Sequence, residues 1–379
     1  MKIAQVAPLM ESVPPRFYGG TERIASYLTE ELVAQGHDVT LFASGDSITS
    51  AQLVPCCAKA LRLNPEVRDP TPYYMLMLDK VRRRAFEFDV VHFHMDQFHF
   101  PIFRDIAQRT ITTLHGRQDL PDMLPLYAGF PEMRLISISN AQRKPAPDAS
   151  YIATVYHGLP RDLLTPTLHP RGGYLAFIGR ISPEKRVDRA IRIARAVGLP
   201  LKIAAKVDRV DMEYFKSEIE PMLSEPGVEF IGEIDERRKA SFLGEARALL
   251  FPIDWPEPFG LVMIEAMACG TPVLAFRNGS VAEVIDEGVT GFIVDSEEEG
   301  VRKLGALLAL DRGRVRRRFD ERFTASRMAA DYVKIYKSLV PAAKDRRGLR
   351  LVAAPGHGTA AAQDSIRSAR GNGPAPVIS

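Results

Sequence analysis

Cysteine is scarce in this sequence, and its placement excludes several kinds of protein. The 379 residues contain three cysteines, Cys56, Cys57 and Cys269. An adjacent pair and one distant residue form neither a disulfide framework nor a zinc-ligand pattern. Because so few cysteines are typical of a reducing compartment, we expect a cytoplasmic protein.

Long apolar runs and two common nucleotide motifs are also missing. No stretch approaches the roughly 18 apolar residues that a membrane-spanning helix requires, and the start, MKIAQVAP, lacks the apolar core of a signal peptide. No G-x-G-x-x-G follows the first predicted strand, and no G-x-x-x-x-G-K-[ST] occurs. A dinucleotide-dependent dehydrogenase and a P-loop enzyme are therefore not expected.

Charge is nearly balanced, with a basic excess at the C-terminal end. The formal net charge is +3, and residues 342–379 contain six basic and two acidic residues. This segment is rich in Gly, Ala, Ser and Pro, so we predict a disordered tail. Its charge is compatible with peripheral contact to an anionic membrane, although a solvated extension is the simpler interpretation. We expect no nucleic acid partner.

Short apolar strands alternate with amphipathic helices, which predicts an α/β protein with parallel sheets. A segment rich in Pro, Gly and Thr, residues 160–173, is the expected linker, and the alternation restarts after it. We therefore predict two doubly wound domains with ligands at the carboxyl ends of their strands. The predicted strands are residues 2–8, 38–43, 89–94, 109–115, 134–138, 174–179, 201–205, 228–231, 248–252, 272–275 and 291–294, and the predicted helices are 21–35, 72–88, 183–197, 237–247 and 257–269.

Two segments of the second half place charge at a predicted helix start. In FIGRISPEKR, Arg180 and Lys185 flank the Ser182-Pro183 helix start, an arrangement suited to a diphosphate. The alternative is two solvated cations with Glu184 as their ion partner, and spacing alone does not decide between them.

The segment WPEPFGLVMIEAMACGTPVLA raises a different question, because two carboxylates interrupt an apolar run. Glu257 falls near the expected helix start, where it could simply complement the helix dipole. Glu265 lies about two turns further on, on a helix that is apolar nearly all round and therefore buried. A buried carboxylate needs a partner, so we expect a cation or the vicinal hydroxyls of a ribose or sugar.

These residues resemble the retaining glycosyltransferases of the GT-B fold, most closely glycosyltransferase family 4. Glu257 and Glu265 match the family's E-x7-E signature, and the resemblance covers roughly residues 1–340. It implies domains at residues 1–165 (acceptor side) and 166–322 (nucleotide-sugar side), and a helix at residues 323–341 that crosses back to the first domain. Further matching segments are GGTE (19–22), DVVHFH (89–94), LHG (114–116), GR…EK (179–185), NGSVAE (278–283) and GVTGF (288–292).

The resemblance also implies a role for each matching position. Arg180 and Lys185 would neutralise the donor's diphosphate, so that no metal or other cofactor is expected. Glu257 would bind a hydroxyl of the donor sugar, Glu265 the ribose hydroxyls, and His115 would lie over the reacting sugar. Backbone groups would contact the donor at Gly19, Gly20, Phe259, Gly260, Leu261 and Val262. The acceptor, a glycan, a lipid or a small metabolite, is not identified.

Some alternatives stay open at this point. His92 and His94 share one face of a strand, with His99 nearby, but no carboxylate or cysteine cluster completes a metal site, so structural or acceptor-side roles are favoured. Asp96 and Asp119 are candidate acceptor-side bases. A non-hydrolysing nucleotide-sugar 2-epimerase, or an inert sugar-nucleotide-binding scaffold, remains the alternative function.

Overall fold

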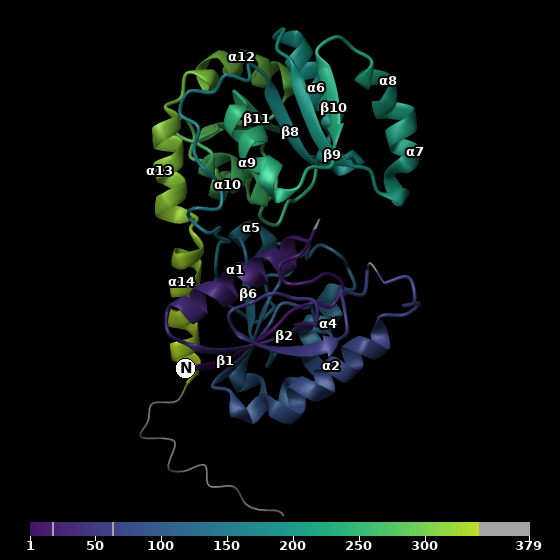
Figure 1. Cartoon of the computed structure of the whole chain (residues 1–379), viewed down its shortest axis with the longest axis vertical. Helices are drawn as coiled ribbons and strands as arrows, with labels where there is room; N and C mark the ends of the chain where they lie inside the picture. Colours follow the sequence, from purple (N-terminus) through teal and green to yellow (C-terminus); the bar gives the residue numbers. More distant parts are fainter. Residues whose placement is uncertain (17–18, 63, 341–379) are drawn as a thin grey trace, which may run out of the picture. The chain divides into compact units, whose positions relative to one another are not determined.

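The computed structural model describes residues 1–16, 19–62 and 64–340. Residues 1–340 form one compact unit that contains two parallel sheets (Figure 1). The predicted disordered tail lies outside the described residues. Within the described part of the chain, no helix has the length and apolar character needed to cross a membrane.

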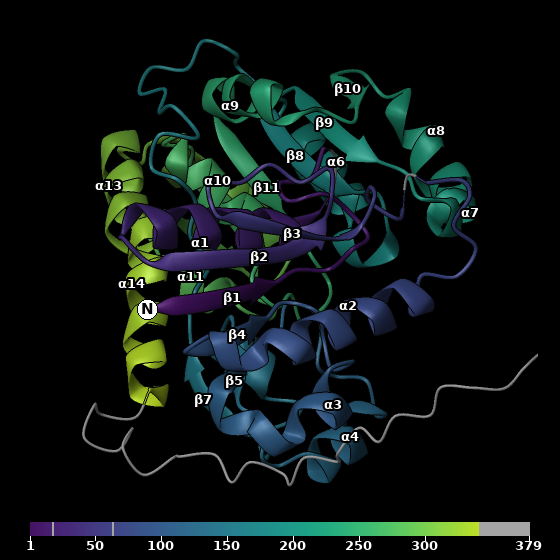
Figure 2. The ribbon, with the colours of Figure 1, turned by 60° about the horizontal axis from the view of Figure 1, so that its bottom comes forward.

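The first sheet has seven parallel strands in the order β3-β2-β1-β4-β5-β6-β7, and Figure 2 shows β1, β2 and β3 side by side. The two edge strands, β3 and β7, were not predicted. Their side chains are only partly buried, and β3 contains Pro55, which suits an edge position. The strands are β1 (Lys2–Val6), β2 (Asp38–Ser44), β3 (Gln52–Cys57), β4 (Val90–Phe93), β5 (Thr110–Thr113), β6 (Leu135–Ser137) and β7 (Tyr151–Thr154).

Two helices cover opposite faces of this sheet. Successive strand residues point to opposite sides, so neighbours on β1 show which helix lies on which face. Ile3 of β1 belongs to the same apolar cluster as Ile24 of α1 (Gly20–Ala34). Its neighbour Ala4 belongs to the cluster of Met77 on α2 (Thr71–Arg84). The first domain is therefore doubly wound, as the alternating pattern predicts.

The second sheet repeats this plan with six parallel strands in the order β10-β9-β8-β11-β12-β13. Leu175 of β8 packs with α6 (Val187–Ala196) and α12 (Glu297–Leu308), whereas Ala176 faces α9 (Glu236–Glu245) and α10 (Leu261–Ala268). The strands are β8 (Leu175–Arg180), β9 (Leu201–Lys206), β10 (Val228–Gly232), β11 (Ala248–Phe251), β12 (Val273–Phe276) and β13 (Gly291–Val294). The shorter helices of the chain are α3 (Phe100–Phe103), α4 (Met123–Gly129), α5 (Asn140–Arg143), α7 (Met212–Tyr214), α8 (Glu220–Leu223) and α11 (Val281–Val284).

Two predicted helices differ from the structure, and a left-handed residue explains each difference. Gly260 has φ of 77°, so α10 begins at Leu261 and Glu257 lies in the preceding loop rather than at the helix start. Arg186 has φ of 52° and divides the other predicted helix into a short 3-10 turn and α6. An α-helix cannot pass through a left-handed residue.

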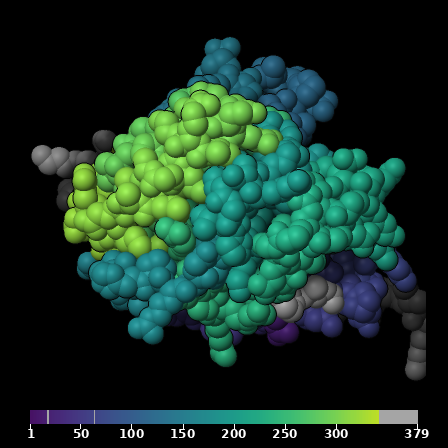
Figure 3. Space-filling model, turned by 90° about the horizontal axis from the view of Figure 1, so that it is seen from above, coloured from purple at the N-terminus to yellow at the C-terminus, as the bar shows by residue number. Residues whose placement is uncertain are grey.

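The last two helices of the described residues run from the inter-domain connection to the first domain. On α13 (Arg312–Arg322), the Arg316 guanidinium donates to the carbonyl oxygens of Arg161 and Leu164, both at 2.7–2.8 Å, so this helix lies beside the inter-domain connection (Figure 3). The following α14 (Ala325–Leu339) packs against α1 of the first domain. The apolar side of this segment is buried: Phe323, Met328, Tyr332 and Tyr336 are fully buried, and Leu339 is partly buried.

Candidate functional site

The predicted site residues follow the strands at which each sheet reverses its order. Strand order switches between β1 and β4 in the first sheet and between β8 and β11 in the second. In open α/β sheets, ligands bind at the carboxyl ends of the strands beside such a switch point. Gly19 and Gly20 come after β1, Arg180 is the last residue of β8, and Lys185 and Glu257 lie in the segments that follow β8 and β11. His115 follows β5, one strand beyond the switch point of the first sheet.

Glu257 has two partners, which answers part of the question that its apolar surroundings raise. The Lys185 ammonium forms an ion pair with its carboxylate, and Trp255 Nε1 donates to the same oxygen at 3.0 Å. The ammonium also lies 4.7 Å from the centre of the Trp255 ring. The side chains of Lys185 and Glu257 are 19% and 12% exposed, so both can be reached from solvent. The sequence predicted Lys185 and Glu257 but not their direct contact.

The loop around Glu257 is held by a second close approach. Ser280 N donates to the Glu257 carbonyl oxygen at 3.0 Å. Gly279 has φ of 53°, and a Cβ there would lie 2.2 Å from the same oxygen. Only glycine fits at this position.

Arg180 is surrounded by carboxylates. It forms an ion pair with Glu184, as the alternative interpretation of this segment expected, and lies 3.5 Å from Asp211 and 3.8 Å from Asp208. Its side chain is 34% exposed. The two predicted phosphate-binding cations thus both have carboxylate partners.

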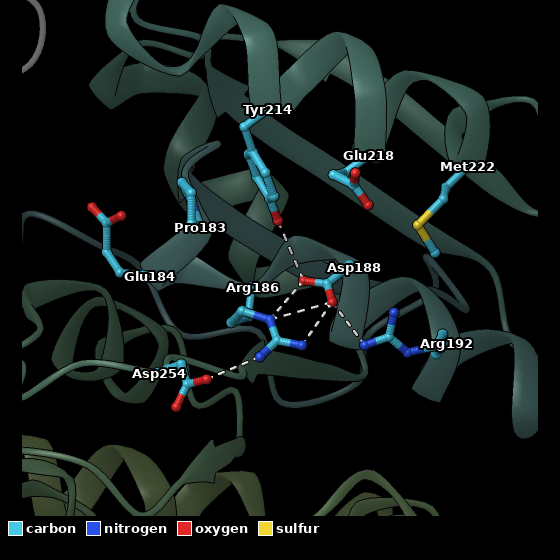
Figure 4. Close-up of a pocket in the computed structure, with 9 residues that line it drawn as sticks. All are labelled: Pro183, Glu184, Arg186, Asp188, Arg192, Tyr214, Glu218, Met222 and Asp254. Atoms are coloured by element: carbon cyan, nitrogen blue, oxygen red, sulfur yellow. Dashed lines mark hydrogen bonds and ion pairs between the residues drawn. The ribbon is translucent and has the colours of Figure 1, made fainter.

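An ion-pair network fixes the turn that follows Lys185 (Figure 4). The Asp188 carboxylate accepts from Arg186 Nε at 3.0 Å and from Arg192 at 2.7 Å, and Arg186 also donates to Asp254 at 2.9 Å. These residues line a cavity of about 630 Å³ beside the site. Because each cation already faces a carboxylate, we interpret this network as support for the position of Lys185.

The start of α10 offers free backbone donors. Among the described residues, no acceptor meets the N–H groups of Leu261 and Val262. The Phe259 ring is buried, 5.0 Å from the ring of His157. A Cβ at Gly20 would lie 3.7 Å from Leu261 Cδ1, so the glycine loop faces this helix end. Free N–H groups at a helix start favour an anion.

Glu265 has the cationic partner that its burial requires. Lys239 Nζ on α9 lies 2.6 Å from the Glu265 carboxylate, and the two side chains are 13% and 7% exposed. Lys239 also lies 3.3 Å from Glu236, which pairs with Arg23 of α1. Sequence reasoning missed Lys239, because a lysine on an amphipathic helix carries no signal that distinguishes it from a solvated one.

His115 lies in a cluster of buried aromatic side chains. Burial lowers its pKa to about 3, so the ring is neutral at ordinary pH. Its ring stacks on His157, with centroids 5.2 Å apart, and its Nε2 lies 3.0 Å from His94 Nδ1. His157 follows the unpredicted edge strand β7 and was missed in the sequence for that reason.

His99 and Asp119, two further candidates from the sequence, have structural partners. His99 stacks on Phe93, with centroids 3.7 Å apart, and bonds Thr112 at 2.8 Å. Asp119 pairs with Arg117 at 2.6 Å, and this hydrogen bond lowers its pKa. In the described ranges, no three His, Cys, Asp or Glu side chains are grouped so that they could hold a metal ion.

Comparison with known proteins agrees with this geometry. The family model described as Glycosyltransferase Family 4 matches residues 18–175, and that described as Glycosyl transferases group 1 matches residues 167–324. A D-inositol 3-phosphate glycosyltransferase from Mycobacterium sp. (strain KMS) is 30% identical over 205 residues, which cover 48% of this chain and 43% of that protein. The chain thus spans less than half the length of the first relatives that it matches. A phosphatidyl-myo-inositol mannosyltransferase from Mycobacterium leprae is 26% identical and covers 94% of this chain and 98% of that protein.

Solved structures share the fold. Sucrose-phosphate synthase from Thermosynechococcus elongatus superposes with a TM-score of 0.73 at 18% identity, over 89% of this chain and 98% of that one. The Anabaena protein HepE in complex with UDP and glucose superposes with a TM-score of 0.67 at 18% identity, over 89% of this chain and 100% of that one. The chain therefore belongs to the group 1 glycosyltransferases of family 4, with the GT-B fold.

Proposed function

We propose that this protein transfers a sugar from a nucleoside-diphosphate sugar to a hydroxyl acceptor, with retention of anomeric configuration and without a metal. The observation that carries the proposal is the contact between Lys185 and Glu257 beside the free N–H groups of α10. A cation, a hydroxyl-binding carboxylate and an anion-binding helix end then meet at the switch point of the second sheet.

Donor binding would rearrange the ion pairs of the site. Diphosphate oxygens would take the place of Glu257 at Lys185 and of Glu184 at Arg180. Glu257 would then accept a hydrogen bond from a sugar hydroxyl, and Glu265 one from the ribose. Negative charge grows on the diphosphate as the glycosidic bond breaks, and fixed cations stabilise the transition state more than the ground state. In the proposed mechanism, the acceptor attacks from the face that the leaving group vacates, and no carboxylate acts as a nucleophile.

A donor and acceptor panel tests the activity. Relatives are named for D-inositol 3-phosphate and phosphatidyl-myo-inositol, so both belong among the acceptors, together with glycans and small metabolites. Release of nucleoside diphosphate in the presence of a chelator, with an α-linked product from an α-linked donor by NMR, supports the proposal. An altered sugar on an intact nucleotide would show the epimerase instead, and binding without turnover would show the inert scaffold.

Site variants assign the roles. We expect Lys185→Met and Glu257→Gln each to lower kcat at least about 100-fold, the usual effect of removing one preorganised charge-stabilising group. The matched control is Lys202→Met, which removes a lysine that pairs with Glu229 on the surface at 3.0 Å. Full turnover in both site variants would rule out this assignment.

A further inference from the structure

A chain of side-chain hydrogen bonds connects the last helix of the protein with His115. Gln5 on β1 stands at its centre, and both Figure 1 and Figure 2 show α14 next to the start of β1. Gln5 Nε2 donates to the Tyr336 hydroxyl at 3.0 Å, and Gln5 Oε1 lies 2.7 Å from His94 Nε2. His94 Nδ1 in turn lies 3.0 Å from His115 Nε2. Gln5 and Tyr336 are fully buried, and His94 is 2% exposed.

The orientation of the Gln5 amide, with its nitrogen toward Tyr336 and its oxygen toward His94, sets the positions of the hydrogens. Burial lowers the pKa of both His94 and His115, so each ring is neutral and carries one N–H. The oxygen of the Gln5 amide can only accept, so the hydrogen of His94 is on Nε2 and its Nδ1 has a lone pair. That lone pair must accept from His115, which places the hydrogen of His115 on Nε2.

The hydrogen bonds on the other side of Gln5, from Tyr336 to Thr113, fit the same donor-to-acceptor direction. Because the Tyr336 hydroxyl accepts from Gln5, its own hydrogen is available for His92 Nδ1, 2.7 Å away. His92 Nε2–H then donates to Thr113 Oγ1 at 2.8 Å. With this direction, Tyr336, His92 and Thr113 complete the hydrogen bonds of a Gln5 amide whose oxygen faces His94.

We propose that Gln5, His94 and Tyr336 are positioning residues, which hold His115 as the Nε2–H tautomer and leave its Nδ1 to accept a hydrogen bond from a hydroxyl of the bound sugar. Nδ1 of His115 has no hydrogen-bond partner among the residues that the structure describes, and the residue is partly exposed. The sugar contact rests on the proposed function. The tautomer assignment does not, because it depends only on contacts within the protein.

The tautomer can be measured without any substrate. Long-range 1H–15N NMR of the full chain labelled with 15N-histidine distinguishes a protonated from an unprotonated ring nitrogen, and comparison with His115→Asn identifies the His115 signals. We expect hydrogen on Nε2 of His115. Hydrogen on Nδ1 would overturn the proposal, because the chain of hydrogen bonds from Tyr336 to His115 (the relay) would then have the opposite donor-to-acceptor direction.

Variants connect the tautomer with catalysis. Gln5→Met keeps the side-chain volume and removes the amide, so we expect mixed His115 tautomers and about a tenfold lower kcat, the loss of one hydrogen bond in the transition state, with KM changed less than twofold. Tyr336→Phe removes a single oxygen, should act in the same direction with a smaller loss, and provides the test if Gln5→Met does not fold.

A neighbouring threonine provides the matched control. Thr112→Val removes a buried hydroxyl whose partner among the described residues is His99, outside this chain of hydrogen bonds, so the His115 signals and kcat should stay unchanged. A loss of kcat in Gln5→Met with an unchanged His115 tautomer would show a merely structural role and overturn the proposal. If the wild-type chain shows the expected tautomer but turns over no donor, the proposed function fails and the tautomer assignment stands.

Discussion

We expect the two partners of the ion pair between Lys239 and Glu265 to differ in how much stability the protein loses when each one is replaced. Glu265 is 7% exposed, and Lys239 is the partner that the structure shows for its carboxylate within the described residues. Lys239→Met would therefore leave a buried carboxylate unpaired, a change that costs about 3 kcal/mol of unfolding free energy. Glu265→Gln would leave Lys239 with its second carboxylate, Glu236, at 3.3 Å, so we expect a loss of about 1 kcal/mol.

Urea unfolding followed by circular dichroism measures both losses, and the double variant completes a cycle. We expect Lys239→Met combined with Glu265→Gln to be more stable than Lys239→Met alone, since the neutral amide removes the unpaired charge. The control is Lys303→Met, which breaks an exposed pair with Glu287 (3.2 Å, side chains 36% and 47% exposed) and should cost less than about 1 kcal/mol. Additive losses, or a larger loss for Glu265→Gln than for Lys239→Met, would refute the reasoning.

Three further predictions follow from the packing. Gly279→Ala should lower kcat in a chain that still folds, because a Cβ 2.2 Å from the Glu257 carbonyl oxygen must displace the loop. Unchanged steady-state kinetics of the folded variant would contradict this. Burial lowers the pKa of His99, so the unfolded chain takes up the proton first, and stability is complete above about pH 6.5 and falls on acidification. His99→Leu should therefore reduce the acid slope by about 1.4 kcal/mol per pH unit, as unfolding at several pH values would show. Arg312→Met should cost about 3 kcal/mol, because it leaves three carbonyl oxygens and Thr271 without their donor; a loss below about 1 kcal/mol in urea unfolding would refute this estimate.

Local pattern was sufficient for the architecture. The alternation of short apolar strands and amphipathic helices determined two doubly wound domains, because a strand or helix buries its apolar face in a periodic way that depends only on neighbouring residues. The edge strands β3 and β7 are not predicted, since their half-buried side chains weaken the periodic apolar pattern. Helix bounds differ from the prediction where Gly260 and Arg186 adopt a left-handed conformation, which composition does not reveal.

The sequence by itself also predicted four charged site residues: Arg180 and Lys185 at and after the end of β8, Glu257 in the loop after β11, and Glu265 on α10. Only the tertiary structure decided which charges meet. Lys185 contacts Glu257, which lies 72 residues away in the sequence. Lys239 faces Glu265 instead of solvent. The relay through Gln5 and Tyr336 joins groups that are 331 residues apart. Such contacts depend on how the helices and strands pack against one another, whereas hydrophobic periodicity indicates only which face of each helix or strand is buried.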